Sequence, residues 1–141
     1  MAETSLWIYF FAVGVGGIAG TLLRFGAVEF FKKYTKFPAG VLFVNVVGTF
    51  VFTLATFILA DEAASFLHYT ESFTDTEIEY AKCFFNIGIL GSLTTFSAYS
   101  YDTFLLVEKK EYKTALLNIT SNIFLCTAAA AIAVLIFMKY F

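Results

Sequence analysis

Four long uncharged stretches constrain this chain more than any other feature. They lie at residues 5–23, 37–60, 83–101 and 114–138. A helix needs about 20 mostly apolar residues to cross the hydrocarbon core of a bilayer. Only 14% of the 141 residues are charged, whereas an ordinary soluble domain carries roughly 25%. The sequence therefore predicts an all-α membrane protein with four transmembrane helices and no separate soluble domain.

The whole chain is expected to form a single transmembrane domain, residues 1–141. With their interfacial ends included, the four spans are predicted at about residues 5–30, 38–60, 82–106 and 113–139. The one proline, Pro38, opens the second span, where its missing N–H costs little. The residues before the first span lack the positive charge of a signal peptide, so cleavage there is not expected.

Positive charges are distributed unequally over the connectors. Connectors one and three carry seven of the nine Lys and Arg residues: Arg24, Lys32, Lys33, Lys36, Lys109, Lys110 and Lys113. The other side has only Lys82 and Lys139, and the second connector, residues 61–82, is acidic. The positive-inside rule then places connectors one and three in the cytoplasm and both termini outside. The predicted location is the cell (plasma) membrane, crossed several times.

The third span holds an unusual polar run, Thr94-Thr95-Phe96-Ser97. Seven hydroxyl-bearing residues fall between Ser92 and Tyr101, and two glycines precede them. This composition is typical of a helix broken in the middle of the membrane, where freed backbone groups line a cavity and can bind ions. The alternative is a kinked but continuous helix whose hydroxyls bond back to the preceding turn.

Other polar residues in the spans each allow two interpretations. Arg24, at the end of the first span, either anchors the helix at the headgroups or serves an ion. Asn45 either joins two helices through a hydrogen bond or points its amide at a passing anion. Asn118 and Asn122 share one face of the fourth span, as a polar track or as a headgroup-facing end. Four short helices cannot enclose a wide pore, so an oligomer is expected.

Cysteine and histidine offer no chemistry of their own here. Cys83 and Cys126 lie in or at the edge of spans, where packing as small apolar residues is the usual role. The single His68 has no second His or Cys nearby with which to hold a metal. No paired carboxylates converge within the spans. We therefore do not expect an enzyme, nor a nucleic-acid partner.

Three motifs resemble those of the Fluc (CrcB) fluoride channels. They are Gly17-x-x-Gly20-x-x-x-Arg24, Asn45-x-x-Gly48 and Gly88-x-x-Gly91-x-x-Thr94-Thr95-Phe96-Ser97. The resemblance covers all four spans in order. It implies an antiparallel, dual-topology dimer with two narrow fluoride pores, each lined by both chains.

The resemblance also implies roles for individual residues. The fluoride pathway would comprise Asn45, Thr95, Phe96, Ser97, Tyr99, Asn118 and Asn122. Arg24 would stand at the vestibule. The backbone carbonyls of Gly91 and Thr94 would bind a structural sodium ion at the dimer axis.

The chain also departs from the family pattern. Tyr99 replaces a phenylalanine, Ala98 stands where threonine is common, and Asn118 and Asn122 stand where the family favours tyrosine and serine. The unequal charge differs from members that insert in both orientations. It indicates one subunit of a heterodimer with an oppositely oriented paralogue, the alternative partner being a second copy of the chain.

The function predicted from the residues and the resemblance is a passive, fluoride-selective channel that exports the ion. Fluoride holds its water tightly, so a pore must offer donors such as amides and hydroxyls, and the positive edges of aromatic rings. The alternative is a small four-helix, multidrug-type proton-coupled exporter. Such an exporter needs a carboxylate in the first span, and residues 5–23 contain none.

Overall fold

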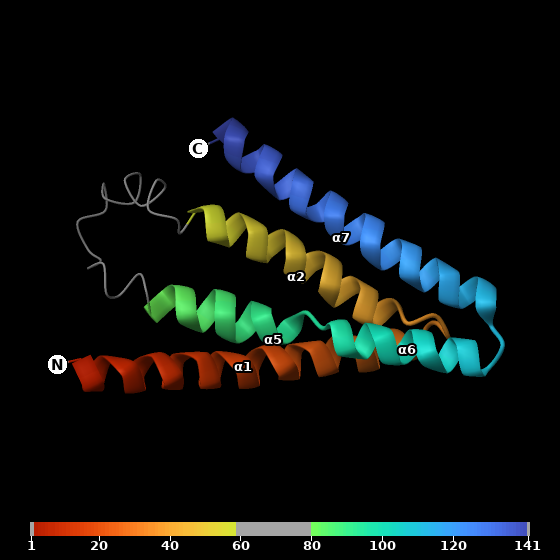
Figure 1. The fold of residues 1–141 in the computed structure, drawn as a ribbon, viewed down its shortest axis with the longest axis horizontal. Helices are drawn as coiled ribbons and strands as arrows, with labels where there is room; N and C mark the ends of the chain where they lie inside the picture. Colours follow the sequence, from red (N-terminus) through yellow and green to blue (C-terminus); the bar gives the residue numbers. More distant parts are fainter. Residues whose placement is uncertain (1, 59–79, 141) are drawn as a thin grey trace.

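The structure, a computed structural model, describes residues 2–58 and 80–140. Most of the acidic second connector, including His68, lies outside the described residues. The elements are α1 (Ala2–Lys32), α2 (Ala39–Ile58), the π-helix η1 (Cys83–Leu90), α5 (Gly91–Leu93), α6 (Phe96–Glu108) and α7 (Tyr112–Tyr140). The described part of the chain is therefore all-helical, as predicted (Figure 1).

Three of these helices are long and apolar enough to cross a membrane. The candidate spans are Leu6–Lys32, Ala39–Ile58 and Tyr112–Tyr140. The segment between the second and third of them is instead divided into η1, α5 and α6. Its three pieces run in the same general direction, one after another (Figure 1).

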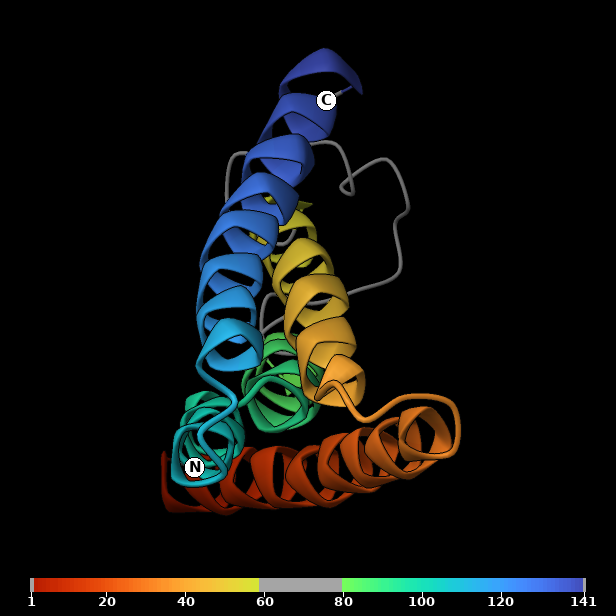
Figure 2. The same cartoon turned by 90° about the vertical axis from the view of Figure 1, so that its right-hand side faces the viewer.

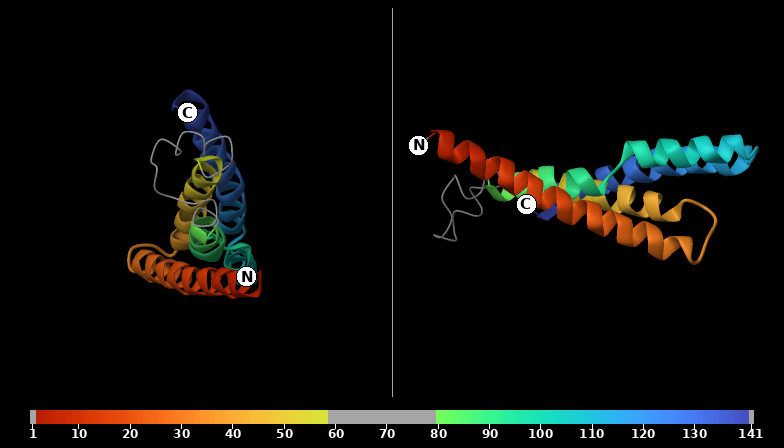
Figure 3. Two further views of the ribbon diagram at one scale, coloured as in Figure 1. Left: turned by 90° about the vertical axis from the view of Figure 1, so that its left-hand side faces the viewer. Right: turned by 90° about the horizontal axis from the view of Figure 1, so that it is seen from below.

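The helices pack in layers. In Figure 2, α1 lies at the base, η1 and α6 lie above it, and α7 lies farther away. α1 packs on η1, α2 and α5, while α2 also packs along α7. The start of α1 and the end of α7 lie at one end of the bundle, and the connectors between α1 and α2 and between α6 and α7 lie at the other (Figures 1 and 3).

The core between these layers is small, and the outer surface is apolar. The buried apolar side chains of the described residues are Val41, Val44, Leu90, Leu106, Ala115, Ala129 and Ala133. Large side chains such as Trp7, Phe11 and Phe124 are exposed. Lipid tails can cover such a surface, because no hydrophobic penalty applies outside water. The packing therefore depends on close backbone contact more than on a large core.

Glycines make the contact between α1 and the η1–α5 segment possible. A Cβ atom on Gly16 would meet the Phe84 carbonyl oxygen, and one on Gly20 would meet the Ile89 carbonyl oxygen and the Ser92 hydroxyl. Small residues at this spacing let helices in lipid approach closely. The η1 segment therefore lies directly on the backbone of α1.

The connector between α6 and α7 is a compact turn. Lys110 has a positive φ of 62°, and its N–H donates to the Val107 carbonyl at 2.9 Å. The Glu111 N–H donates to the Leu106 carbonyl, also at 2.9 Å. This pair of bonds satisfies the last carbonyls of α6 as a Schellman motif does. The turn brings α7 back alongside α6.

The glycine contact gives a prediction about stability. Gly20→Ala should lower the free energy of unfolding by about 1–3 kcal/mol, because the added methyl group overlaps backbone and must push α1 away from η1. Gly14→Ala is the matched control, since nothing lies within 4 Å of its Cβ position. The thermal unfolding midpoints of both variants in detergent check this, with the loss of folded protein measured by size-exclusion chromatography. Equal midpoints for the two variants would contradict the packing described.

Candidate functional site

The site begins where the helix of η1 and α5 ends. Thr94 has φ −75° and ψ 147°, and Thr95 has φ −153° and ψ 121°. Both residues are therefore extended, and α6 starts after them at Phe96. The hydroxyls of Ser92 and Thr94 still donate to carbonyls of the preceding turn, at 2.7 and 3.1 Å from Gly88 and Leu90. Back-bonding hydroxyls and an interrupted backbone thus occur together.

Asn45 of α2 replaces the backbone bonds that the interruption removes. The Thr95 N–H donates to Asn45 Oδ1 at 2.8 Å, and Asn45 Nδ2 donates to the Thr95 carbonyl at 3.2 Å. Thr95 is buried, and an unpaired backbone group in a membrane costs several kcal/mol, or roughly what one lost hydrogen bond costs in hydrocarbon. One side chain therefore satisfies the donor and the acceptor of an extended residue.

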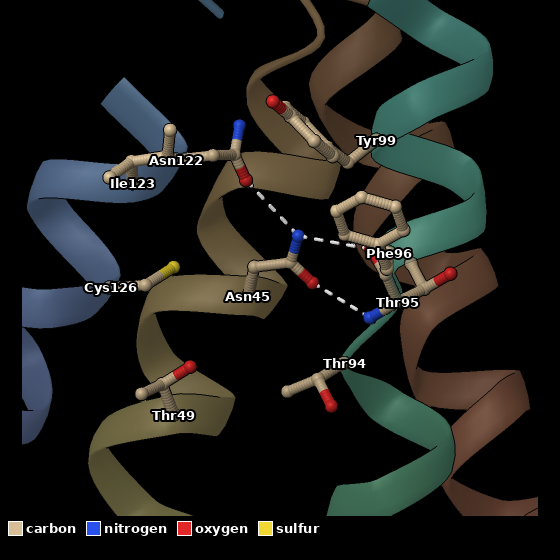
Figure 4. Close-up of a pocket in the computed structure, with 9 residues that line it drawn as sticks. All are labelled: Asn45, Thr49, Thr94, Thr95, Phe96, Tyr99, Asn122, Ile123 and Cys126. Atoms are coloured by element: carbon tan, nitrogen blue, oxygen red, sulfur yellow. Dashed lines mark hydrogen bonds between the residues drawn. The ribbon is translucent and has the colours of Figure 1, made fainter. Parts of the chain in front are cut away.

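The same asparagine is also bonded to α7. Its second Nδ2 hydrogen points to Asn122 Oδ1, at 3.1 Å. Both amide hydrogens of Asn45 are thus engaged within the chain, as Figure 4 shows. This geometry is the one expected if Asn45 joins helices through hydrogen bonds.

The Thr95 side chain starts the next helix. Its Oγ1 accepts a hydrogen bond from the Ala98 N–H at 3.2 Å, which is the geometry of an N-cap. The same oxygen lies 3.1 Å from Ser97 Oγ. The backbone and the side chain of Thr95 therefore do different tasks, one held by α2 and the other capping α6.

The carbonyls of Gly91 and Thr94 are among those at this point that lose the donors of a continuous helix. In an α-helix, the N–H of residue i bonds to the carbonyl of residue i−4. The Gly91 carbonyl would take the Thr95 N–H, which goes to Asn45 instead. The Thr94 carbonyl would take the Ala98 N–H, which goes to the Thr95 side chain. Both carbonyl oxygens are hard ligands of the kind that sodium and other hard cations prefer, so the two residues fit the predicted role.

Gly48 allows the interrupted segment to approach α2. A Cβ atom at this position would overlap the Thr94 methyl group. Gly48 lies three residues after Asn45, so both face the same side of α2. The Asn45-x-x-Gly48 motif thus combines a hydrogen-bonding side chain with the space that it needs.

A hollow of about 520 Å³ opens beside the interruption. Its lining residues come from α2, α7 and the segment around Thr95: Asn45, Thr49, Thr94, Thr95, Phe96, Tyr99, Asn122, Ile123 and Cys126 (Figure 4). The rings of Phe96 and Tyr99 lie 5.5 Å apart, tilted by 56°. Phe96 is 80% exposed, so the described part of the chain leaves this wall of the hollow uncovered.

The lining contains no charged side chain among the described residues. It offers hydroxyls, amides and aromatic rings in surroundings that are mostly apolar. Such groups bind a small anion weakly, through donors and through the positive edges of rings. Weak binding at several places is what passage of an ion requires.

The structure brings together most of the residues predicted for the site. Six of the predicted residues line the hollow: Asn45, Thr94, Thr95, Phe96, Tyr99 and Asn122. Ser97 is joined to them through the Thr95 hydroxyl. Asn118 does not line the hollow, but it is bonded to Asn122, which does. Gly91 lies one turn before Thr95, and Arg24, on α1, is not part of the lining.

Sequence reasoning did not single out four residues that belong to this region. Thr49, Ile123 and Cys126 line the hollow, and Thr103 bonds to Asn118. Helical spacing could have found two of them, because Thr49 lies four residues after Asn45 and Cys126 four after Asn122. Cys126, expected to be inert packing, lies at the wall of the hollow.

Comparisons with known proteins agree on one family. Residues 11–134 match the family model described as CrcB-like protein, Camphor Resistance (CrcB). A fluoride-specific ion channel FluC 1 of Methanosarcina barkeri is 35% identical over 125 residues, 89% of this chain and 93% of that protein. FluC 3 of Methanosarcina acetivorans is 36% identical over 126 residues, 89% and 98% of the two chains. A FluC of Campylobacter jejuni is 35% identical over 127 residues, 89% and 93% of the two chains.

The N-cap gives a prediction about the site. Thr95→Ala should lower the free energy of unfolding by about 1 kcal/mol, because the Ala98 N–H loses its partner. Thr95→Ser keeps the hydroxyl and should stay close to the parent protein. Thermal midpoints in detergent distinguish the two variants. The capping role fails if Ser destabilises as much as Ala.

Proposed function

This chain belongs to the CrcB-like family, and from that premise we propose that it is a fluoride-selective channel that passively exports fluoride across the cell membrane. One observation carries the proposal: relatives with 35% and 36% identity are named fluoride-specific ion channels. The chain's own hollow, lined by uncharged polar groups and two aromatic rings, supports it.

The hollow supports a pathway for a small, strongly hydrated anion. Thr95, Phe96 and Tyr99 would contact the ion, with Ser97 beside them. Asn122 would hold Asn45 in place, since its Nδ2 already donates to the Asn118 carbonyl and side chain. Aromatic ring edges can face an anion without holding it firmly. None of the described lysines and arginines lies in the lining, so the ion would not be trapped by a full positive charge there. Asn45 would act mainly by holding Thr95, since both its amide hydrogens are already used.

The pieces η1, α5 and α6 would together form the third of four membrane crossings. They cover Cys83–Leu90, Gly91–Leu93 and Phe96–Glu108, which matches the length that one span needs. The interruption at Thr94 and Thr95 would then lie within the bilayer. The bonds from Asn45 support this, because they satisfy backbone groups that lipid could not.

A second chain would complete the pore. The exposed Phe96 ring and the open side of the hollow need a cover, and an antiparallel dimer would give each pore walls from both chains. The basic connectors would lie in the cytoplasm and the termini outside, following the positive-inside rule. This charge bias favours an oppositely oriented paralogue as partner, with a second copy of the chain as the alternative.

A structural sodium ion would be held at the dimer axis by the backbone carbonyls of Gly91 and Thr94. Support comes from the two diverted N–H groups, which leave these carbonyls without their helical donors. When bound, sodium would supply a fixed positive charge near the interruption. Arg24, at the end of the first span, would stand at the vestibule.

A multidrug-type proton-coupled exporter is not favoured. The one acidic residue within the candidate span Leu6–Lys32 is Glu29, which pairs with Lys32 at the end of α1. The relatives that match this chain carry a channel name.

The channel proposal is tested by efflux from liposomes that contain the functional dimer. Fluoride should leave rapidly and chloride hardly at all. Phe96→Ile should abolish fluoride release without dissociating the dimer, because it removes the ring edge from the hollow. An ion-selective electrode measures the release, and size-exclusion chromatography measures the dimer.

Phe104→Ile is the matched control. Phe104 lies on the same helix, is exposed and does not line the hollow, so its variant should release fluoride at the parent rate. Unchanged flux in Phe96→Ile would sink the pore assignment, and equal loss in both variants would mean that exposed rings matter for another reason.

The partner proposal gives a separate prediction. Reconstituted alone, this chain should give little fluoride efflux, and efflux should rise on adding a paralogue whose charge bias is opposite. Chemical cross-linking checks whether the two chains associate in opposite orientations. Full efflux and antiparallel dimers from this chain alone would refute the heterodimer.

A further inference from the structure

Asn118 of α7 occupies an unusual position for a residue predicted in an ion pathway. It is only 1% exposed, and it does not line the hollow. Burying an amide costs free energy unless its hydrogen bonds are made. Leucine would fill a similar volume in this setting at no such cost. The bonds of Asn118 therefore indicate what it does.

A line of hydrogen bonds runs from the interruption to Asn118, and each residue in it donates to the next. The Thr95 N–H donates to Asn45 Oδ1 at 2.8 Å, and Asn45 Nδ2 donates to Asn122 Oδ1 at 3.1 Å. Asn122 Nδ2 in turn donates to Asn118 Oδ1 at 3.1 Å. Each asparagine accepts on its oxygen and donates from its nitrogen to the next.

The line continues from Asn118 back to α6. Asn118 Nδ2 donates to Thr103 Oγ1 at 2.9 Å. The Thr103 hydroxyl donates to the Tyr99 carbonyl at 2.8 Å. The line that starts at Thr95 therefore ends at Tyr99, one turn further along the same segment.

Backbone groups fix the direction of this line. The Thr95 N–H can only donate, so Asn45 must present its oxygen there. The Asn118 carbonyl can only accept, so Asn122 must present its nitrogen there, at 3.0 Å. The Tyr99 carbonyl also can only accept, which leaves the Thr103 oxygen free to accept from Asn118. No amide can turn over without leaving a buried group unpaired.

The two ends of this line therefore lie at the two aromatic residues of the hollow. Phe96 follows Thr95 directly, and Tyr99 carries the final carbonyl. Building on the channel function proposed above, we infer that Asn118 and Thr103 are positioning residues. They hold the first turns of α6 against α7 and thereby fix the Asn45 amide and the two rings, without touching the ion.

The test compares Thr103→Val with Thr103→Ser in the functional dimer. Valine keeps the shape of threonine but leaves Asn118 Nδ2 without its acceptor, whereas serine keeps the hydroxyl. Fluoride efflux per folded dimer should fall about tenfold in the valine variant, the effect of one hydrogen bond of ordinary strength. It should be largely retained with serine. Thr120→Val is the control, since the Thr120 hydroxyl donates within its own helix, to the carbonyls of Leu116 and Leu117.

The role of Asn118 itself is tested by combining Asn118→Leu with Thr103→Val. Asn118→Leu should reduce efflux as Thr103→Val does, and the combination should be no worse than Asn118→Leu alone, because both remove the same line of bonds. If Asn118 instead bound fluoride directly, Thr103→Val would transport like the parent while Asn118→Leu would not. That result overturns the inference, as does parent-like efflux in both variants.

A readout without transport separates this inference from the channel proposal. In protein with labelled asparagine, the side-chain amide signals of Asn45 and Asn122 should shift in Thr103→Val and not in Thr120→Val. A shift without any fluoride efflux from the parent dimer would refute the channel and keep the positioning role. Unmoved amide signals would refute the positioning role, whatever the channel transports.

Discussion

Two hydrogen bonds between the Asn45 side chain and the backbone of Thr95 support the rest of this structure. Lipid offers no partner for a backbone N–H or carbonyl, so a helix in a membrane cannot stop unless the protein supplies one. Asn45 supplies both, at 2.8 and 3.2 Å. The extended backbone at Thr95 therefore depends on that single residue of α2, while the Thr95 side chain caps the new helix that starts at Phe96.

Other features can be understood as what this arrangement requires. Gly48 gives the Thr94 methyl group room against α2, and Gly20 gives the η1–α5 segment room against α1. Asn122 and Asn118 hold the Asn45 amide from the opposite side. The interrupted segment is thus fixed by backbone contact on one face and by amides on the other. A hollow with uncharged walls can remain beside it because every buried amide in the line is bonded.

The sequence predicted the helices and most of the residues that meet at the hollow. It did not predict the hydrogen bonds between those residues. Hydropathy predicted the all-helical membrane architecture because the bilayer imposes a length on each span. Polar residues in apolar surroundings drew attention to Asn45 and to the run from Thr94 to Ser97, where two residues are extended. Whether that run breaks a membrane crossing, and whether a partner chain closes the hollow, remain predictions. The bond between Asn118 and Thr103 could not be foreseen, because it depends on the relative rotation of α6 and α7. The same is true of the π-helical turns of η1, which packs on α1.

The most direct test concerns the backbone at the interruption. Solid-state NMR of the protein in lipid bilayers can measure the carbon chemical shifts of Thr94 and Thr95. The account predicts extended shifts at both residues, helical shifts on either side, and a loss of this pattern in Asn45→Leu. Helical shifts at both threonines in the parent protein would contradict it.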